Sequence, residues 1–278
     1  MKFALLLLLT SLVCTSAIAQ TTGPEKGSLV IVGGGQVGPE IINKFIELAG
    51  GPNAKIVVIP TAAGRAKYDE SNNSYQLFKK AGATNLTLLH TDDPNVANTP
   101  KFTAPLKNAD AVWFGGGRQW RLVDSYGDTE SEELFWKVLD RGGVIGGSSA
   151  GATIQGSYLA RGDTENNQIM MGDHEEGFGF VENIAIDQHV LARNRQFDLF
   201  EIIREKPELL GIGIDESTAV VVKKNRFEVI GQSYVLIYDN NFWSREGSDL
   251  KKLPAKENTF YMLRSGDKYD MKARKVIE

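Results

Sequence analysis

The chain has 278 residues, 42% of them hydrophobic and 24% charged, and its formal net charge at pH 7 is -4. This composition is sufficient for an apolar core, and the slightly acidic balance excludes the basic surface typical of nucleic-acid binding. Cys14 is the only cysteine and lies in a segment that we expect to be removed, so we expect neither disulfides nor cysteine metal sites in the mature protein.

The first 19 residues have the pattern of an export signal. Lys2 precedes the apolar run 4–9, and the small residues Ala17 and Ala19 stand directly before Gln20. The apolar run is shorter than the ~20 residues that a membrane-spanning helix needs, and no later segment approaches that length. We therefore expect a signal peptide at 1–19, a single domain at 20–278, secretion into the periplasm or the medium, and no membrane attachment after the signal is removed.

Short apolar segments bounded by Gly, Pro or Asn alternate with segments of helical periodicity in the first half of the chain. The strands predicted from this pattern lie at 29–32, 56–59, 86–89, 111–114 and 144–145, and helical spacing covers 41–48, 75–78 and 134–139. Strands then follow one another without helices at 219–222, 227–230 and 234–237. The order predicts an α/β fold, with a mostly parallel sheet flanked by helices on both faces and added antiparallel strands toward the C-terminus.

Residues 147–151, Gly-Ser-Ser-Ala-Gly, form a G-x-S-x-G pattern between the strand ending near residue 145 and a helix expected over 150–159. In a tight strand-to-helix turn the small flanking residues allow close packing, and the helix N-terminus supplies N–H groups for a developing oxyanion. The pattern predicts Ser149 as the nucleophile of a serine hydrolase. Ser148 is the rival, but only Ser149 has glycine at both flanking positions. In the alternative interpretation the serine only caps the helix.

A serine hydroxyl becomes a strong nucleophile only when a base accepts its proton. The chain has three histidines. His90 ends a core-like strand, and His174 lies in an acidic stretch where a solvated side chain is expected. His189 ends an apolar stretch and precedes two arginines, which makes it the preferred base.

The base needs a carboxylate that orients its ring. Asp215 and Glu216 follow another apolar strand and are both candidates, and Asp187 is a third. Either carboxylate of the first pair would follow the histidine in the chain. This order differs from that of α/β-hydrolases and disfavours an ordinary esterase.

Residues 33–38 fit the G-x-G-x-x-G pattern of dinucleotide-binding proteins and follow the strand 29–32. The next strand, however, ends in Pro60-Thr61-Ala62 and lacks the acidic residue that holds a ribose hydroxyl. Dinucleotide binding therefore remains a minor alternative, beside a catalytically silent protein that keeps the fold for binding.

These segments together resemble the cyanophycinase branch of the cyanophycinase and dipeptidase E family of serine peptidases. The resemblance rests on 31–35, 59–62, 114–119, 147–152, 187–189 and 213–219. It implies a fold like that of class I glutamine amidotransferases, a Ser149 nucleophile, a His189 base and Glu216 as the orienting acid. It also implies an acyl-enzyme without metal or cofactor, and oxyanion donors at Gly116, Gly117 and the N–H of Ala150.

The resemblance further implies a substrate pocket, and the residues that would line it are Gln119, Asp187, Gln188, Arg193 and Arg195. Arginines suit the binding of substrate carboxylates. In the alternative interpretation Arg193 and Arg195 only lie on the first turn of a helix and bind no substrate. The expected substrate is cyanophycin or a related β-aspartyl or acidic peptide, cleaved by exopeptidase action, and a homodimer is compatible with the sequence. Arg118 stands where members tend to carry an acidic residue, and Asp198 where they carry an arginine, so two charges near the pocket are reversed.

Overall fold

The computed structural model describes residues 22–245 and 259–277, and the expected signal peptide lies outside these residues. Two sheets form its framework. The larger sheet has the spatial order β14 (Lys275–Ile277), β13 (Lys268–Asp270), β10 (Arg226–Gly231), β9 (Thr218–Lys223), β1 (Ser28–Val32), β5 (Val144–Ser148), β4 (Ala111–Phe114), β2 (Lys55–Ile59) and β3 (Asn85–Leu88). The smaller sheet has the order β12 (Tyr261–Arg264), β11 (Tyr234–Tyr238), β8 (Leu210–Ile214), β7 (Val181–Gln188) and β6 (Gly156–Tyr158).

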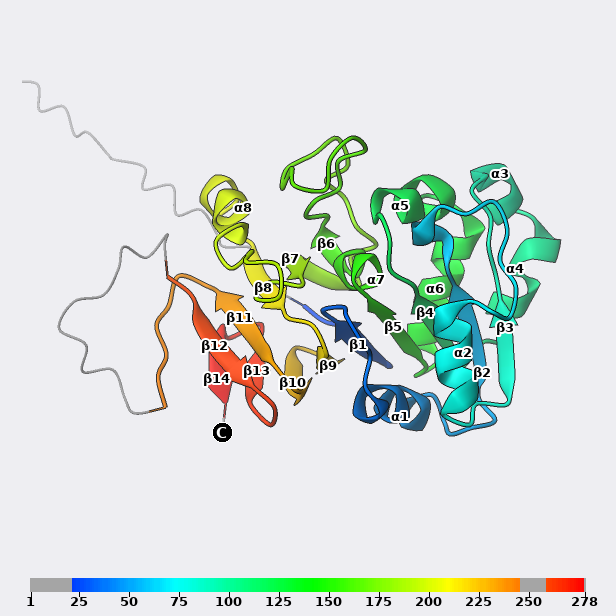
Figure 1. Ribbon diagram of the computed structural model, residues 1–278, viewed down its shortest axis with the longest axis horizontal. Helices are drawn as coiled ribbons and strands as arrows, with labels where there is room; N and C mark the ends of the chain where they lie inside the picture. Colours follow the sequence, from blue (N-terminus) through cyan, green and yellow to red (C-terminus); the bar gives the residue numbers. More distant parts are fainter. Residues whose placement is uncertain (1–21, 246–258, 278) are drawn as a thin grey trace, which may run out of the picture.

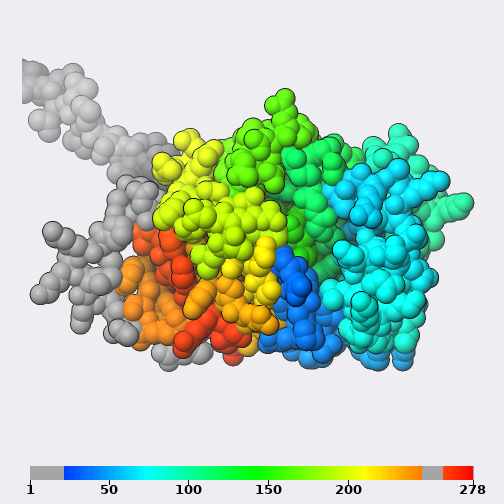
Figure 2. Space-filling view, in the orientation of Figure 1, coloured from blue at the N-terminus to red at the C-terminus, as the bar shows by residue number. Residues whose placement is uncertain are grey.

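Both sheets are parallel in one part and antiparallel in the other. In the larger sheet β1, β5, β4, β2 and β3 are parallel to one another, whereas β9 pairs antiparallel with β1, and β10, β13 and β14 continue the antiparallel part. In the smaller sheet β6, β7 and β8 are parallel, and β11 and β12 are antiparallel. Figure 1 shows the C-terminal antiparallel strands at one end of the molecule and α2 to α5 at the other, and Figure 2 shows the same separation on the surface.

Helices cover both faces of the parallel part. The helical segments are α1 (Pro39–Leu48), η1 (Thr61–Ala63), α2 (Asn73–Lys80), α3 (Pro94–Ala97), α4 (Pro100–Lys107), α5 (Trp120–Tyr126), α6 (Glu130–Asp140), α7 (Ala150–Thr153) and α8 (Leu199–Glu205). Phe45 of α1 and Phe78 of α2 share one apolar cluster with Val30 of β1. Phe135 of α6 lies on the other face, in a cluster that includes Ile31. The α/β fold class predicted from the sequence is confirmed.

The same cluster joins the two sheets. Ile31 of the larger sheet and Ile186 and Ile212 of the smaller one belong to it, and all three side chains are almost fully buried. The opposite face of the smaller sheet is covered by α8, whose Leu199 and Ile202 pack with Ala185 and Leu236 among others. Within the described residues no helix is long and apolar enough to span a membrane.

The helix expected over 150–159 is the main error in the predicted elements. It ends after one turn at Thr153, and Gly156–Tyr158 forms β6, which pairs with β7. β-Branched residues at 153 and 154 and a glycine at 156 all disfavour helix continuation. A Cβ at Gly156 would lie 2.8 Å from the carbonyl oxygen of Ile184, so the strand pairing itself depends on the absence of a side chain there.

Candidate active site

Ser149 stands alone between the end of β5 and the start of α7. Its backbone has φ 59° and ψ -115°, a region that residues with a side chain rarely adopt. The turn is tight, because a Cβ at Gly147 would lie 2.3 Å from the carbonyl oxygen of Gly151. The Ser149 side chain makes no capping hydrogen bond to the helix, so the capping alternative does not describe its position.

His189 directly follows β7 and also has a positive φ of 56°. Its ring is almost fully buried, and Nε2 lies 2.9 Å from Oγ of Ser149. A neutral imidazole with its proton on Nδ1 can accept the hydroxyl proton at this distance.

Glu216 completes the row of groups from the other side of the imidazole. Its Oε1 lies 2.5 Å from Nδ1 of His189. Asp215, the competing candidate, points elsewhere: Oδ1 accepts hydrogen bonds from the backbone N–H groups of Leu191 and Ala192, and Oδ2 accepts one from the Ser233 hydroxyl. Of the three carboxylates considered from the sequence, only Glu216 reaches the ring.

Burial lowers the pKa of His189 below its ordinary value, because the charged imidazolium loses its hydration. The Glu216 carboxylate opposes this decrease, while the positive charges of Arg193 and Arg195 add to it. The imidazole is therefore neutral near pH 7 and able to act as a base.

The glycine run after β1 is explained by its contacts with these side chains. A Cβ at Gly34 would lie 2.2 Å from Cε1 of His189, and one at Gly35 would lie 2.6 Å from Oε2 of Glu216. Gly33 is equally restricted, since its Cβ would lie 2.2 Å from the carbonyl oxygen of Asp215. The run that suggested dinucleotide binding thus makes room for the imidazole and its carboxylate.

Of the three predicted oxyanion donors, Gly116 lies against Ser149 and Ala150 directly follows it. A Cβ at Gly116 would lie 3.3 Å from Cβ of Ser149, so this glycine is a direct neighbour of the serine. Gly117 has φ 147° and packs against the carbonyl of Ala62, which leaves no room for a side chain. Ala150 is the first residue of α7, where backbone N–H groups have no acceptor within the helix.

The predicted pocket residues lie in different environments. Gln119 is buried, and its Nε2 donates to the carbonyls of Ala160 and Arg161. Gln188 is also buried, and its Oε1 has no hydrogen-bond partner among the described residues. Arg193 is exposed and Arg195 is buried, and both lie in the turn before α8 and not in its first helical turn.

Asp187, one of the predicted pocket residues, is paired inside the protein. Its side chain is fully buried, and its two oxygens accept hydrogen bonds from Nε and Nη2 of Arg161 at 2.8 and 3.0 Å. Asp198, the second charge reversal, also pairs with this guanidinium. Arg118, the first, donates to the carbonyl of Asp163. Arg161 had no signal in the sequence, because nothing in its neighbourhood marks a buried arginine.

The two other histidines are engaged away from the serine. His90 Nδ1 lies 2.9 Å from the Thr61 hydroxyl. His174 is less solvated than expected, with 22% of its side chain exposed, and its two ring nitrogens contact Asp124 and Asp173. No cluster of three or more His, Cys, Asp or Glu side chains that could hold a metal ion occurs in the described part of the chain.

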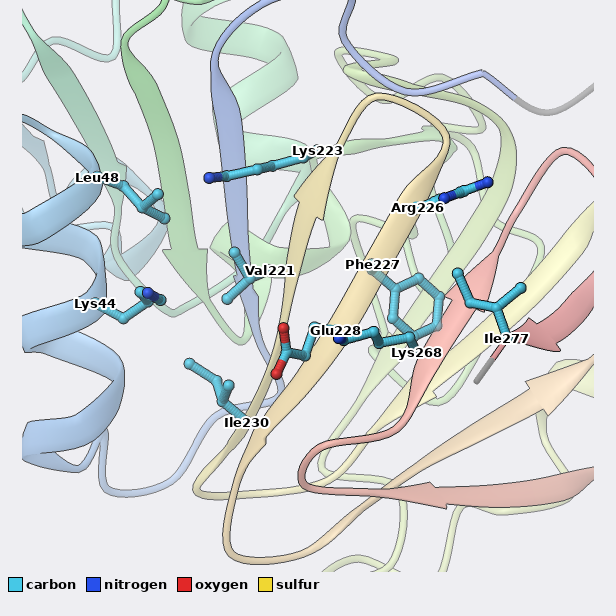
Figure 3. A pocket seen from close by; sticks show the side chains of 10 residues that line it. All are labelled: Lys44, Leu48, Val221, Lys223, Arg226, Phe227, Glu228, Ile230, Lys268 and Ile277. Atoms are coloured by element: carbon cyan, nitrogen blue, oxygen red, sulfur yellow. The ribbon is translucent and has the colours of Figure 1, made fainter. Parts of the chain in front are cut away.

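A cavity of about 390 Å³ opens onto Ser149, and its lining is mostly uncharged. The side chains and glycines around it are Gly35, Gln36, Val37, Asn73, Ser74, Leu77, Trp113, Gly116 and Ser148. Sequence reasoning missed the contribution of α2, whose N-terminus brings Asn73 and Ser74 to this cavity. A larger groove of about 440 Å³ lies between α1 and the strands β9, β10, β13 and β14, and includes none of the predicted site residues (Figure 3).

The chain is similar to known peptidases along most of its length. The sequence model of peptidase family S51 matches residues 29–230. The cyanophycinase of Geminocystis herdmanii (strain PCC 6308) is 30% identical over 263 residues, which is 91% of this chain and 96% of that protein. The cyanophycinase of Trichormus variabilis (strain ATCC 29413 / PCC 7937) is 30% identical over 230 residues, which is 79% of this chain and 76% of that protein.

A solved structure is similar along most of the chain as well. The crystal structure of a peptidase from an acI-B1 actinobacterium matches with a TM-score of 0.63 at 25% identity, covering 89% of this chain and 98% of that one. Since the family model spans most of the chain and the two relatives align over 91% and 79% of it, this protein belongs to peptidase family S51 and is a serine-type peptidase.

Proposed function

We propose that this peptidase hydrolyses cyanophycin or related β-aspartyl and acidic peptides as an exopeptidase, with Ser149, His189 and Glu216 as its catalytic triad. The observation that carries the proposal is the continuous row of contacts, 2.9 Å from Ser149 Oγ to His189 Nε2 and 2.5 Å from His189 Nδ1 to Glu216 Oε1. A nucleophile, a base and an orienting acid in this order are the parts that acyl transfer requires.

The reaction follows from these positions. His189 takes the proton of Ser149 as Oγ attacks the scissile carbonyl, and Glu216 stabilises the resulting imidazolium. The oxyanion accepts hydrogen bonds from backbone N–H groups of the Gly116-Gly117 loop and of Ala150. His189 then protonates the leaving amine, which leaves an acyl-enzyme on Ser149. Water, activated by the same imidazole, releases the acyl group and restores the serine.

The charge of the turn before α8 supports an acidic substrate. Arg193 and Arg195 lie near enough to His189 to lower its pKa, and neither forms an ion pair with a carboxylate among the described residues. A guanidinium can bind both oxygens of a carboxylate. In this proposal the two arginines bind a carboxylate of the substrate close to the scissile bond.

The test compares purified wild-type protein with Ser149→Ala on cyanophycin and on a library of β-aspartyl and acidic peptides. We expect release of dipeptides such as β-Asp-Arg by the wild type and none by the variant. Ser148→Ala is the matched control, since it removes the neighbouring hydroxyl and leaves the proposed nucleophile. A fluorophosphonate probe should label the wild type and Ser148→Ala, and failure to label either would contradict the proposed nucleophile.

We also propose that residues 1–19 are a signal peptide and that the enzyme acts outside the cytoplasm. The support is the sequence pattern of Lys2, the apolar run and the small residues before Gln20. Expression of the full chain in a bacterial host, followed by N-terminal sequencing of the periplasmic protein, should give Gln20 as the first residue. A product that keeps Met1 and stays in the cytoplasm would contradict export.

A further inference from the structure

The carboxylates close to His189 already have partners inside the protein. Glu216 contacts the imidazole, and Asp215 accepts hydrogen bonds from two backbone N–H groups of the following turn. Asp187 and Asp198 both contact the guanidinium of Arg161. Among the described residues, none of these four carboxylates is left free to bind a positively charged group of a substrate.

Arg161 is the centre of this arrangement. Only 1% of its side chain is exposed, and its guanidinium contacts both oxygens of Asp187, one oxygen of Asp198 at 2.5 Å and the carbonyl oxygen of Asn167 at 2.9 Å. The three partners belong to β7, to the turn before α8 and to the loop that follows β6. One guanidinium therefore neutralises two carboxylates and ties together three segments beside His189.

Around Arg195 the charges that remain unpaired are positive. Its neighbours are the guanidinium groups of Arg161 and Arg193 and the carboxylates of Asp187 and Asp198, and both carboxylates contact Arg161. Nη1 of Arg195 donates to the carbonyl oxygen of Gln188, the residue that follows Asp187, so this guanidinium lies beside the strand end that carries the partner of Arg161. Burial lowers the pKa of Arg195, and the positive charge of Arg161 lowers it further. The Gln188 side chain in the same region offers a buried oxygen without a partner, which is uncharged. A cationic group entering here would meet repulsion, and a carboxylate would meet attraction.

We propose that Arg161 is a specificity-determining residue. Its buried guanidinium neutralises Asp187 and Asp198, so the site selects substrates with a carboxylate over substrates with a guanidinium or ammonium group. The proposal rests on the proposed peptidase function and narrows its substrate class. It states that the arginine-bearing units of cyanophycin are poorer substrates than acidic peptides of the same length.

A structural role alone would give a different result. Removing one partner of a buried ion pair destabilises a protein, whatever its substrate. A merely structural Arg161 would lower the activity toward all peptides by the same factor. The quantity to measure is therefore the ratio of kcat/KM for two peptides that are identical except for one residue, aspartate in the first and arginine in the second.

The experiment uses wild type and the variants Arg161→Gln and Asp198→Asn. The wild type should prefer the acidic peptide, and Arg161→Gln should reduce that preference roughly tenfold or more, mainly through KM, since it removes a nearby positive charge. Asp198→Asn should change the preference in the opposite direction, because it removes a negative charge and keeps the contact of Arg161 with Asp187. Arg141→Gln is the matched control, since Arg141 also donates to buried carbonyls, those of Leu106 and Ala109, before β4.

The outcomes separate the two proposals. A wild type that cleaves both peptides equally well, or an unchanged ratio in both variants, would overturn the role of Arg161 and leave the peptidase function intact. If Arg161→Gln does not fold, Asp198→Asn tests the proposal alone. Its kcat/KM ratio must shift toward the acidic peptide, and a shift toward the arginine peptide would overturn the role of Arg161. If no peptide is cleaved, the proposed substrate class fails, and calorimetric titration of Ser149→Ala with the same two peptides still measures the preference, which must favour the acidic one.

Discussion

Gly34→Ala should inactivate the enzyme although it replaces none of the three proposed catalytic residues. The new Cβ would lie 2.2 Å from Cε1 and 2.5 Å from Nε2 of His189. Carbon atoms in contact stay about 3.5 Å apart, so the ring or the loop would have to move by about 1.3 Å. A displacement of this size disrupts the hydrogen bond between Nε2 of His189 and Oγ of Ser149, whose length is 2.9 Å. A misplacement of about 1 Å can cost on the order of 100-fold in rate, and we expect kcat/KM to fall by at least that factor.

The φ of Gly34, +115°, adds about 1–3 kcal/mol of backbone strain for alanine, so stability must be measured together with activity. Gly38→Ala is the matched control in the same glycine run, because nothing lies within 4 Å of its Cβ position and its φ of -67° suits alanine. The assay is peptide hydrolysis and fluorophosphonate labelling, with the melting temperature recorded for both variants. A folded Gly34→Ala protein with wild-type activity would refute the assigned contact between this loop and the imidazole.

Two further predictions concern pH and stability. Since the pKa of His189 is lowered, the acid limb of the pH profile of kcat/KM should have its midpoint below the ordinary histidine pKa of about 6.5. Arg193→Gln should move that midpoint to higher pH, because it removes a positive charge that repels the imidazolium. A midpoint that does not move in this variant would mean that another group controls the acid limb. Asp239→Ala should lower the free energy of unfolding by about 2–5 kcal/mol in urea titrations and leave kcat/KM unchanged, because the buried Asp239 accepts hydrogen bonds from the hydroxyls of Tyr261 and Tyr269. A loss of activity in the folded variant would contradict the separation of this cluster from the active site.

The parallel strands and the position of Ser149 could be predicted because their signals are local. The run Ala111–Phe114 is apolar throughout and forms β4 with the same bounds. It is buried on both faces, so every position must be apolar and the sequence shows it directly. The turn at Ser149 likewise needs glycines at fixed distances along the chain, because Gly147 and Gly151 approach each other within a few residues.

The partner of Asp187 could not be predicted in the same way. Arg161 is 26 residues away in the sequence, and its contact with Asp187 depends on the parallel pairing of β6 with β7. The helix expected over 150–159 hid that pairing, since a continuous helix would have carried Arg161 away from β7. The choice between Asp215 and Glu216 was undecidable from the residues alone for a related reason. They are neighbours in the chain, and only the turn at 191–192, which occupies Asp215, leaves Glu216 to the imidazole.

The loop after β1 explains how three distant segments arrive at one site. Three consecutive carbonyls, those of residues 32, 33 and 34, accept hydrogen bonds from the N–H groups of Ser149, His189 and Ser217 at 3.0, 2.9 and 3.0 Å. Each of these three donors has a positive φ between 56° and 59°. Such conformations cost about 1–3 kcal/mol each and persist where the surroundings fix them. The end of β1 and the glycine run after it therefore have two roles. The carbonyls of Val32, Gly33 and Gly34 hold the strained residues in place, and the missing side chains of the glycines leave the space that the imidazole and Glu216 fill.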